Sequence, residues 1–178
     1  MKYAVFLVTL LGSCSLFPAR MALEQPPVVQ MQALEIANDT ADSSSEYLPP
    51  IFYALSLIGY HEREHRDELT EFLDLDPAET PWCAAFVNSV LAASGMQGTD
   101  SLLARSFIEW GEPQEVPQVG DIVVFSRPPT DWQGHVGFFI NSEVIDGVEY
   151  YRVLGGNQSD RVSIDLYPVS RLLSIRKM

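Results

Sequence analysis

The chain has few basic residues, only two cysteines and no hydrophobic run long enough to cross a membrane as a helix. Its 178 residues include 11 Lys and Arg against 24 Asp and Glu, which gives a net charge of −13. Binding of nucleic acid requires clustered basic side chains, so we expect no nucleic-acid partner. Two cysteines cannot form a disulfide-rich scaffold. Hydrophobic residues make up 47% of the chain, which is enough for a packed core.

Three common catalytic and nucleotide-binding motifs are also missing. The sequence contains no GxxxxGK[ST] phosphate loop and no GxGxxG dinucleotide fingerprint. It has no GxSxG nucleophile elbow of the kind that serine hydrolases use. We therefore expect neither a nucleotide cofactor nor a serine nucleophile of that kind.

The N-terminus has the pattern of an export signal. A basic start at Lys2 precedes the apolar run Tyr3–Leu11, which is much shorter than the about 20 residues of a membrane-spanning helix. The run ends in Leu-Gly-Ser-Cys at residues 11–14, which resembles a bacterial lipobox. This predicts a lipoprotein signal peptide over residues 1–13 and a lipidated Cys14. The alternative is an ordinary signal peptide that is cleaved after Ala19 or Ala22.

These signals predict the organisation and location of the protein. Residues 14–48 are rich in Pro, Ser, Gln and acids, which is typical of a flexible acidic tether. We expect the folded domain to span residues 49–178. The protein would be exported to the cell envelope as a periplasmic lipoprotein, anchored in the outer membrane if the cell is Gram-negative.

Helices come first in the folded part and strands follow. Apolar spacing predicts helices near residues 50–58, 69–73, 80–94 and 101–110, with Thr80 as the N-cap of the third and Cys83 in its first turn. From residue 121 the pattern changes to strands, near residues 121–126, 134–140, 148–154, 162–166 and 172–176. Helices followed by an antiparallel sheet indicate an α+β fold.

One stretch matches the HExxH zinc motif. His61, Glu62 and His65 have the required spacing, which needs one helix face to bring both imidazoles to a metal. Gly59 precedes the stretch, charged residues surround it, and no third ligand follows in the pattern of that family. We interpret it as an exposed turn, and we expect no metal site.

A second constellation has the residues of a cysteine hydrolase. Cys83 at the start of a helix has its thiolate favoured by the positive end of the helix. His135 opens a strand after a turn-rich segment, and Asn157 follows the next strand after Gly155-Gly156. A polar group such as Asn157 would orient the imidazole. Each residue alone has a structural explanation, and their joint placement indicates a site.

Four motifs in this order resemble those of the CHAP and NlpC-type cysteine hydrolases, papain-like enzymes that cut peptidoglycan. They are TPWCAAFV at residues 80–87, GDIVVF at 120–125, GHVGF at 134–138 and LGGNQS at 154–159. The resemblance implies a papain-like α+β fold with a nucleophile helix on an antiparallel sheet of about five strands. It implies the catalytic set Cys83, His135 and Asn157. CHAP enzymes often carry a Glu where this chain has Gly155, so Asp160 and Asp146 are the alternatives for the third position.

The resemblance implies hydrolysis of peptide or amide bonds in peptidoglycan stem peptides, without a cofactor. Two other functions stay open: a zinc metallopeptidase that uses the HExxH match, and an envelope-binding protein of the same fold without catalysis. Candidates for the substrate groove are Trp82, Ser106 and Trp132.

Overall fold

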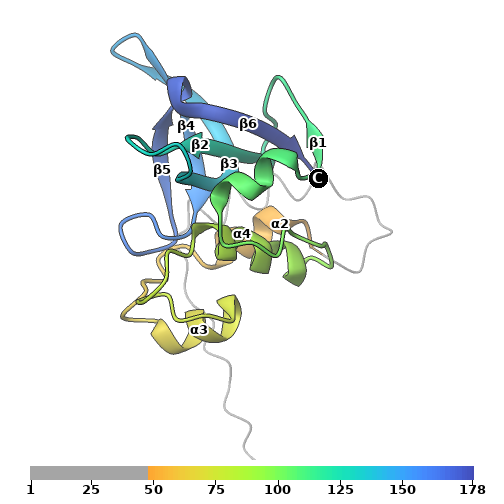
Figure 1. Ribbon diagram of the computed structural model, residues 1–178, viewed down its shortest axis with the longest axis vertical. Helices are drawn as coiled ribbons and strands as arrows, with labels where there is room; N and C mark the ends of the chain where they lie inside the picture. Colours follow the sequence, from red (N-terminus) through yellow and green to blue (C-terminus); the bar gives the residue numbers. More distant parts are fainter. Residues whose placement is uncertain (1–47) are drawn as a thin grey trace, which may run out of the picture.

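The computed structural model describes residues 48–178 as helices packed against one curved sheet (Figure 1). The predicted signal peptide, the lipidation site Cys14 and the tether up to residue 47 lie outside the described residues. Within the described part, no helix is long and apolar enough to cross a membrane.

The sheet has six strands in the order β1-β6-β2-β3-β4-β5, and every neighbouring pair is antiparallel. A two-residue turn at Asp146-Gly147 joins β3 to β4, because both residues adopt the positive φ angles that such hairpins require. The strands are β1 (Glu112–Pro113), β2 (Ile122–Ser126), β3 (Gly134–Ile145), β4 (Val148–Gly155), β5 (Ser163–Pro168) and β6 (Leu172–Lys177).

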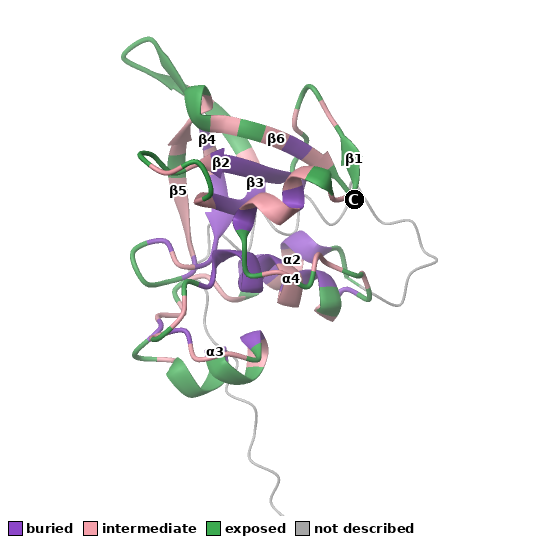
Figure 2. Cartoon of the chain, in the orientation of Figure 1, coloured by how far each residue is buried: buried purple, intermediate pink, exposed green. Residues whose placement is uncertain are grey.

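Helices cover one face of this sheet, and the central helix is α4 (Cys83–Ala93). Seven of its residues are buried, and they pack against β3, β4 and helix α2 (Pro50–Ser56). Figure 2 shows this buried layer between the strands and the helices. Helix α3 (Arg66–Leu73) and two short 3-10 helices, η1 (Ala104–Glu109) and η2 (Val169–Arg171), complete the described part.

The sheet curls strongly around its second face. Phe125 on β2 and Tyr167 on β5 have ring centroids 5.0 Å apart, although β3 and β4 lie between their strands. In a flat sheet, three strand spacings of about 4.8 Å would separate them. The curl encloses a second apolar cluster and brings β5 over the start of β3, where His135 lies.

The α+β class and the papain-like arrangement are confirmed, with three differences in detail. Helix α4 begins at Cys83 with Trp82 as its N-cap, so Thr80 does not cap it. The helix expected near residues 101–110 is the shorter 3-10 helix η1. Strand β1 was not predicted, because its two residues are both exposed and give no hydrophobic pattern.

Candidate active site

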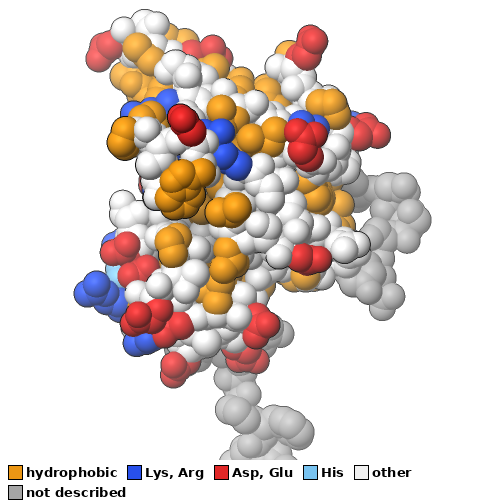
Figure 3. Space-filling view, in the orientation of Figure 1, with side chains coloured by type: hydrophobic (Ala, Val, Ile, Leu, Met, Phe, Trp, Pro, Cys, Tyr) orange, Lys and Arg blue, Asp and Glu red, His pale blue; other side chains and the backbone are white. Residues whose placement is uncertain are grey.

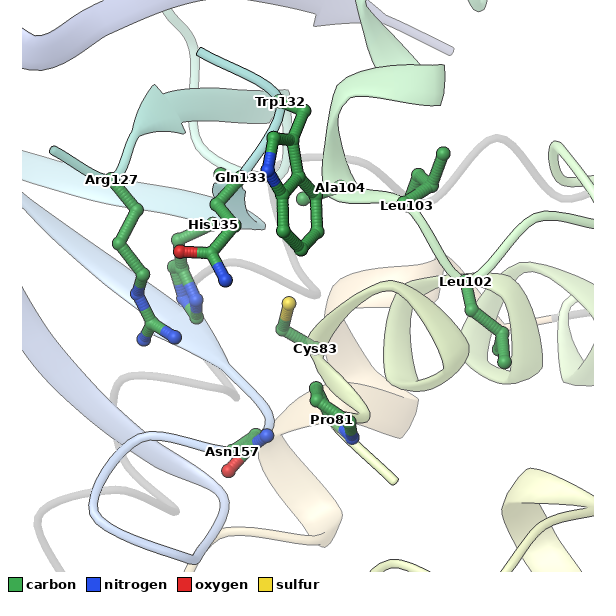
Figure 4. Close-up of a pocket in the computed structure, with 11 residues that line it drawn as sticks. Pro81, Cys83, Leu102, Leu103, Ala104, Arg127, Trp132, Gln133, His135 and Asn157 are labelled. Atoms are coloured by element: carbon green, nitrogen blue, oxygen red, sulfur yellow. The ribbon is translucent and has the colours of Figure 1, made fainter. Parts of the chain in front are cut away.

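Cys83 is the first residue of α4 and lines a pocket at the end of the sheet (Figure 4). Its side chain is 9% exposed, and the thiol points into the pocket. The N-terminal end of a helix carries unpaired N–H groups and a partial positive charge, which stabilises a thiolate placed there. The local structure therefore presents a sulfur atom at the position where a helix favours negative charge.

His135 reaches the same pocket from the start of β3, where it is almost fully buried. Its ring stacks on that of Tyr167, with centroids 4.7 Å apart and planes within 4° of parallel. Imidazole Nε2 lies 2.9 Å from Oε1 of Gln158, another buried residue. The strand, the stacked ring and the amide together fix the orientation of the imidazole.

The hydrogen bonds of Gln158 determine which nitrogen of His135 carries the proton. Its amide Nε2 donates to the carbonyl oxygens of Val153 and Ser163, at 3.3 and 2.6 Å, so Oε1 is the atom that faces His135. A carbonyl oxygen only accepts, and therefore His135 Nε2 must donate. The neutral imidazole then has its lone pair on Nδ1, which is buried and makes no hydrogen bond to any described residue.

The position of Gln158 corrects the predicted role of Asn157. Asn157 lines the pocket, but its side chain lies apart from the imidazole in Figure 4. Its backbone has a φ of 57°, so it acts as a left-handed turn residue, as Asn readily does. The side-chain amide that holds His135 comes from the next residue in the chain.

Gly155 leaves room for the contact between His135 and Gln158. A Cβ atom on Gly155 would lie 3.0 Å from both Gln158 Oε1 and His135 Nε2, closer than Cβ atoms ordinarily come. The space beside the imidazole is occupied by the Gln158 amide, which arrives from the following loop. A polar partner for His135 is thus present at residue 158.

Burial keeps both the thiol and the imidazole neutral in the free protein. Burial raises the pKa of Cys83, although the backbone N–H of Val136 and the charge of Arg127 act in the opposite direction. Burial lowers the pKa of His135 from 6.5 to about 4, and the bond to Gln158 only partly offsets it. At neutral pH the pocket is therefore lined by a thiol and by a neutral imidazole that can accept a proton.

Of the predicted groove residues, only Trp132 lines the pocket. Its side chain is 63% exposed beside the thiol. Trp82 is fully buried and belongs to the core, which corrects the expectation that it lines a groove. The prediction for Ser106 is also wrong, because this residue does not line the pocket. Its hydroxyl donates to Oγ1 of Thr99 at 2.7 Å.

The HExxH stretch does not form the helix that zinc binding requires. His61 pairs with Arg161 in an isolated bridge, and the following residues form turns. The carboxylate of Glu62 points inward, where it accepts a hydrogen bond from the Trp82 indole at 3.3 Å. No group of three or more His, Cys, Asp or Glu side chains within residues 48–178 could hold a metal ion.

That stretch has a structural role next to the site. Backbone hydrogen bonds join residues 59–62 to the loop that carries Gln158: Gly59 N–H to Val162, Val162 N–H to Tyr60 and Glu62 N–H to Asp160, each at 2.9 Å. We call residues 156–162 the orienting loop. The segment that resembles a zinc motif thus supports this loop.

Gln158 and Arg127 belong to the site although the sequence patterns did not predict either of them. Gln158 stands in the quoted motif GGNQS, but positive φ angles at Asn157, Ser159 and Asp160 turn the chain in a way that alternation cannot reveal. Arg127 directly follows β2, whose last residue pairs with Gly134. That register places Arg127 near His135, and the pairing of these two strands is the signal that could have indicated it.

A cysteine on a helix N-terminus, a histidine on the adjacent strand and a curved antiparallel sheet define the papain-like class of cysteine hydrolase folds. Residues 75–157 match the model of the CHAP domain family, which confirms the predicted resemblance. The match indicates amidase or peptidase activity toward peptidoglycan. No curated protein matches the chain.

Proposed function

We propose that this protein is a cysteine hydrolase that cleaves peptide or amide bonds in peptidoglycan, with Cys83 as nucleophile, His135 as base and Gln158 as the residue that positions the imidazole. The observation that carries this proposal is the bond from His135 Nε2 to Gln158, at 2.9 Å. Nδ1 of the same ring has no hydrogen-bond partner among the described residues, and His135 and Cys83 line one pocket. The CHAP match supports the substrate class.

The reaction would proceed by nucleophilic catalysis in two stages. The thiol proton of Cys83 passes to Nδ1 of His135 while the sulfur attacks the carbonyl carbon. The tetrahedral intermediate collapses, the C–N bond breaks, and the imidazolium gives its proton to the departing amine. Water, deprotonated by the same nitrogen, then attacks the thioester and releases the acid and the free thiol.

Two groups could stabilise the oxyanion of the intermediate. One is the backbone N–H of Cys83 at the start of α4. The other is the side-chain amide of Gln133, which lines the pocket. Its Oε1 accepts a hydrogen bond from the Thr130 hydroxyl at 3.1 Å, so its N–H donors are left for the pocket. We propose that Gln133 donates to the oxyanion.

A non-catalytic protein of the same fold is the alternative function. Burial raises the pKa of the Cys83 thiol, so the sulfur is not a preformed thiolate in the free protein. Such a protein would bind peptidoglycan and release no fragments. The zinc metallopeptidase alternative has no support, because Glu62 is turned toward Trp82 and the stretch is not helical.

Digestion of purified peptidoglycan with analysis of the released fragments tests the proposal. We expect fragments with new amino and carboxyl termini, loss of activity with iodoacetamide, and no effect of EDTA. Cys83→Ala should release nothing. Inhibition by EDTA alone, or full activity in Cys83→Ala, would contradict the mechanism, and binding without release would favour the non-catalytic alternative.

We also propose that the mature protein begins at a lipidated Cys14 and is held in the cell envelope by that anchor. The lipobox-like residues 11–14 support this proposal. Mass spectrometry of protein extracted from the membrane fraction should give an N-terminus at Cys14 with a lipid adduct. An unmodified N-terminus further along the chain would contradict it.

A further inference from the structure

Arg127 places a positive charge at one end of the pocket. It follows the last residue of β2, is exposed, and lines the pocket together with Cys83 and His135. Figure 4 shows its side chain on the side of His135 that faces away from Trp132. Its charge acts on both titratable groups of the site, since it lowers the pKa of the thiol and of the imidazole. The guanidinium is therefore close to the reacting groups.

The guanidinium of Arg127 makes no hydrogen bond or ion pair with any described residue. By contrast, Arg66 is paired with Asp76 and Arg152 with Glu143. No Asp or Glu within residues 48–178 lines the pocket, although the whole chain has 24 acidic residues against 11 basic ones. Several acidic side chains lie over α3, and others are spread over the rest of the visible face (Figure 3). The pocket thus holds an unpaired cation in a protein with a large excess of negative charge.

The opposite wall of the pocket is apolar. Leu102, Leu103 and Trp132 expose 52%, 55% and 63% of their surfaces there, and Ala104 lies beside them. In Figure 4 the thiol of Cys83 lies between this wall and Arg127. A ligand that spans the thiol would meet a cation on one side and apolar surface on the other.

We infer that the substrate carries a free carboxylate close to the scissile bond and that Arg127 binds it. A guanidinium recognises a carboxylate through two parallel hydrogen bonds, which gives both orientation and charge selectivity. The inference rests on the proposed function, because it assigns the substrate class of the same site. It makes Arg127 a specificity-determining residue.

Binding to the inactive Cys83→Ala protein tests the inference independently of cleavage. The probes are two soluble peptidoglycan stem peptides that differ only in the carboxylates near the scissile bond, free in one and converted to carboxamides in the other. We expect calorimetry to show about tenfold tighter binding of the free-carboxylate peptide. Adding Arg127→Gln should make the two affinities equal. Equal affinities before that change, or binding of neither peptide, would overturn the inference.

Cleavage kinetics separate this inference from the proposed function. In the active protein, Arg127→Gln should raise KM for the free-carboxylate peptide about tenfold more than KM for the amidated peptide, whereas any effect of the lost charge on the thiol and the imidazole should change kcat equally for both peptides. Arg127→Lys should keep part of the preference. The matched control is Arg171→Gln, which removes an exposed cation of η2 outside the pocket. It should leave KM unchanged for both peptides. Cleavage without preference contradicts the inference alone, whereas no cleavage of either peptide or of peptidoglycan contradicts the proposed function.

Discussion

Both polar atoms of the Gln158 side-chain amide make hydrogen bonds that fix the position of the His135 ring. Its oxygen accepts from His135, while its nitrogen donates to two backbone carbonyls, of Val153 and Ser163. A neutral amide fixes the tautomer of the imidazole without adding a negative charge beside it. The imidazole accordingly stays neutral, since the bond to Gln158 offsets the effect of burial on the pKa only in part.

Removal of the Gln158 amide should therefore impair catalysis more than removal of the Asn157 amide. We expect Gln158→Ala to lower kcat roughly 10- to 1000-fold, because a misplaced catalytic group loses about that much. Asn157→Gly is the matched control, since glycine accepts the φ of 57° and only the side chain is lost. It should change KM more than kcat. Steady-state kinetics measure both effects, and thermal unfolding is measured in parallel. A larger loss of kcat in Asn157→Gly than in Gln158→Ala would show that Asn157 is the residue that orients His135.

Gly155 allows a second test of the same contact. In Gly155→Ala, the new methyl group would come within 3.0 Å of both atoms of the bond between His135 and Gln158. We expect a clear fall in kcat from displacement of the imidazole.

Gly147→Ala is the control for Gly155→Ala, because it should lower stability and leave kcat unchanged. Its added methyl group meets nothing within 4 Å, but its φ of 77° disfavours alanine. It should lose about 1 kcal/mol of stability with unchanged kcat. If Gly155→Ala has the same kcat as the native protein, the contact between His135 and Gln158 does not limit catalysis, and this prediction is contradicted.

Among the elements, the start of α4 is held in place by the residue before it. Trp82 is fully buried, donates its indole N–H to Glu62 and has Gly156 of the orienting loop against its ring. It therefore connects helix α4 with the loop whose Gln158 contacts His135. The helix has no side-chain cap, so tertiary packing fixes its first turn.

Trp82→Ala should destabilise the protein by about 3–5 kcal/mol, as the loss of a large buried aromatic side chain usually does. It also leaves the buried Glu62 carboxylate without its indole donor. Chemical denaturation measures the free energy of unfolding. Trp132→Ala is the matched control, because that side chain is 63% exposed and should leave stability nearly unchanged. A similar small effect in both variants would contradict the assigned role of Trp82.

The order of elements and the elements that carry Cys83 and His135, two residues that line one pocket, could be predicted from local patterns. Hydrophobic periodicity indicated helices before strands, and the motifs around Cys83 and His135 placed both on the right elements. The partner of His135 could not be found in this way. It depends on the left-handed turns of the orienting loop and on the curl of the sheet, both of which arise from tertiary contacts. The burial of Trp82 was missed for the same reason.

For the molecule as a whole, the buried His135 makes stability depend on pH. Its pKa is lowered from 6.5 to about 4 in the folded protein by burial. Between these values the unfolded chain binds a proton that the folded protein does not. The free energy of unfolding should thus fall as the pH drops from 6.5 through about 4, by about 3 kcal/mol in total.

Comparison with a variant isolates this contribution from that of the many carboxylates. Denaturation midpoints of the native protein and of His135→Gln should converge as the pH is lowered, because the variant lacks the group that resists protonation. The difference should be constant above about pH 6.5, where the histidine is neutral in both the folded and unfolded states. A constant difference over the whole range would show that His135 titrates normally.

The hydrogen bonds between residues 59–62 and the orienting loop have a consequence for the order of folding. They join two segments separated by roughly a hundred residues, so this contact closes one of the longest loops in the described chain. Contacts of such long range form slowly compared with local helices and hairpins. Helix α4 and the hairpin of β3 and β4 can therefore form while the loop with Gln158 is still undocked. The site would then be completed at a late step of folding, when the last strands reach the first helices.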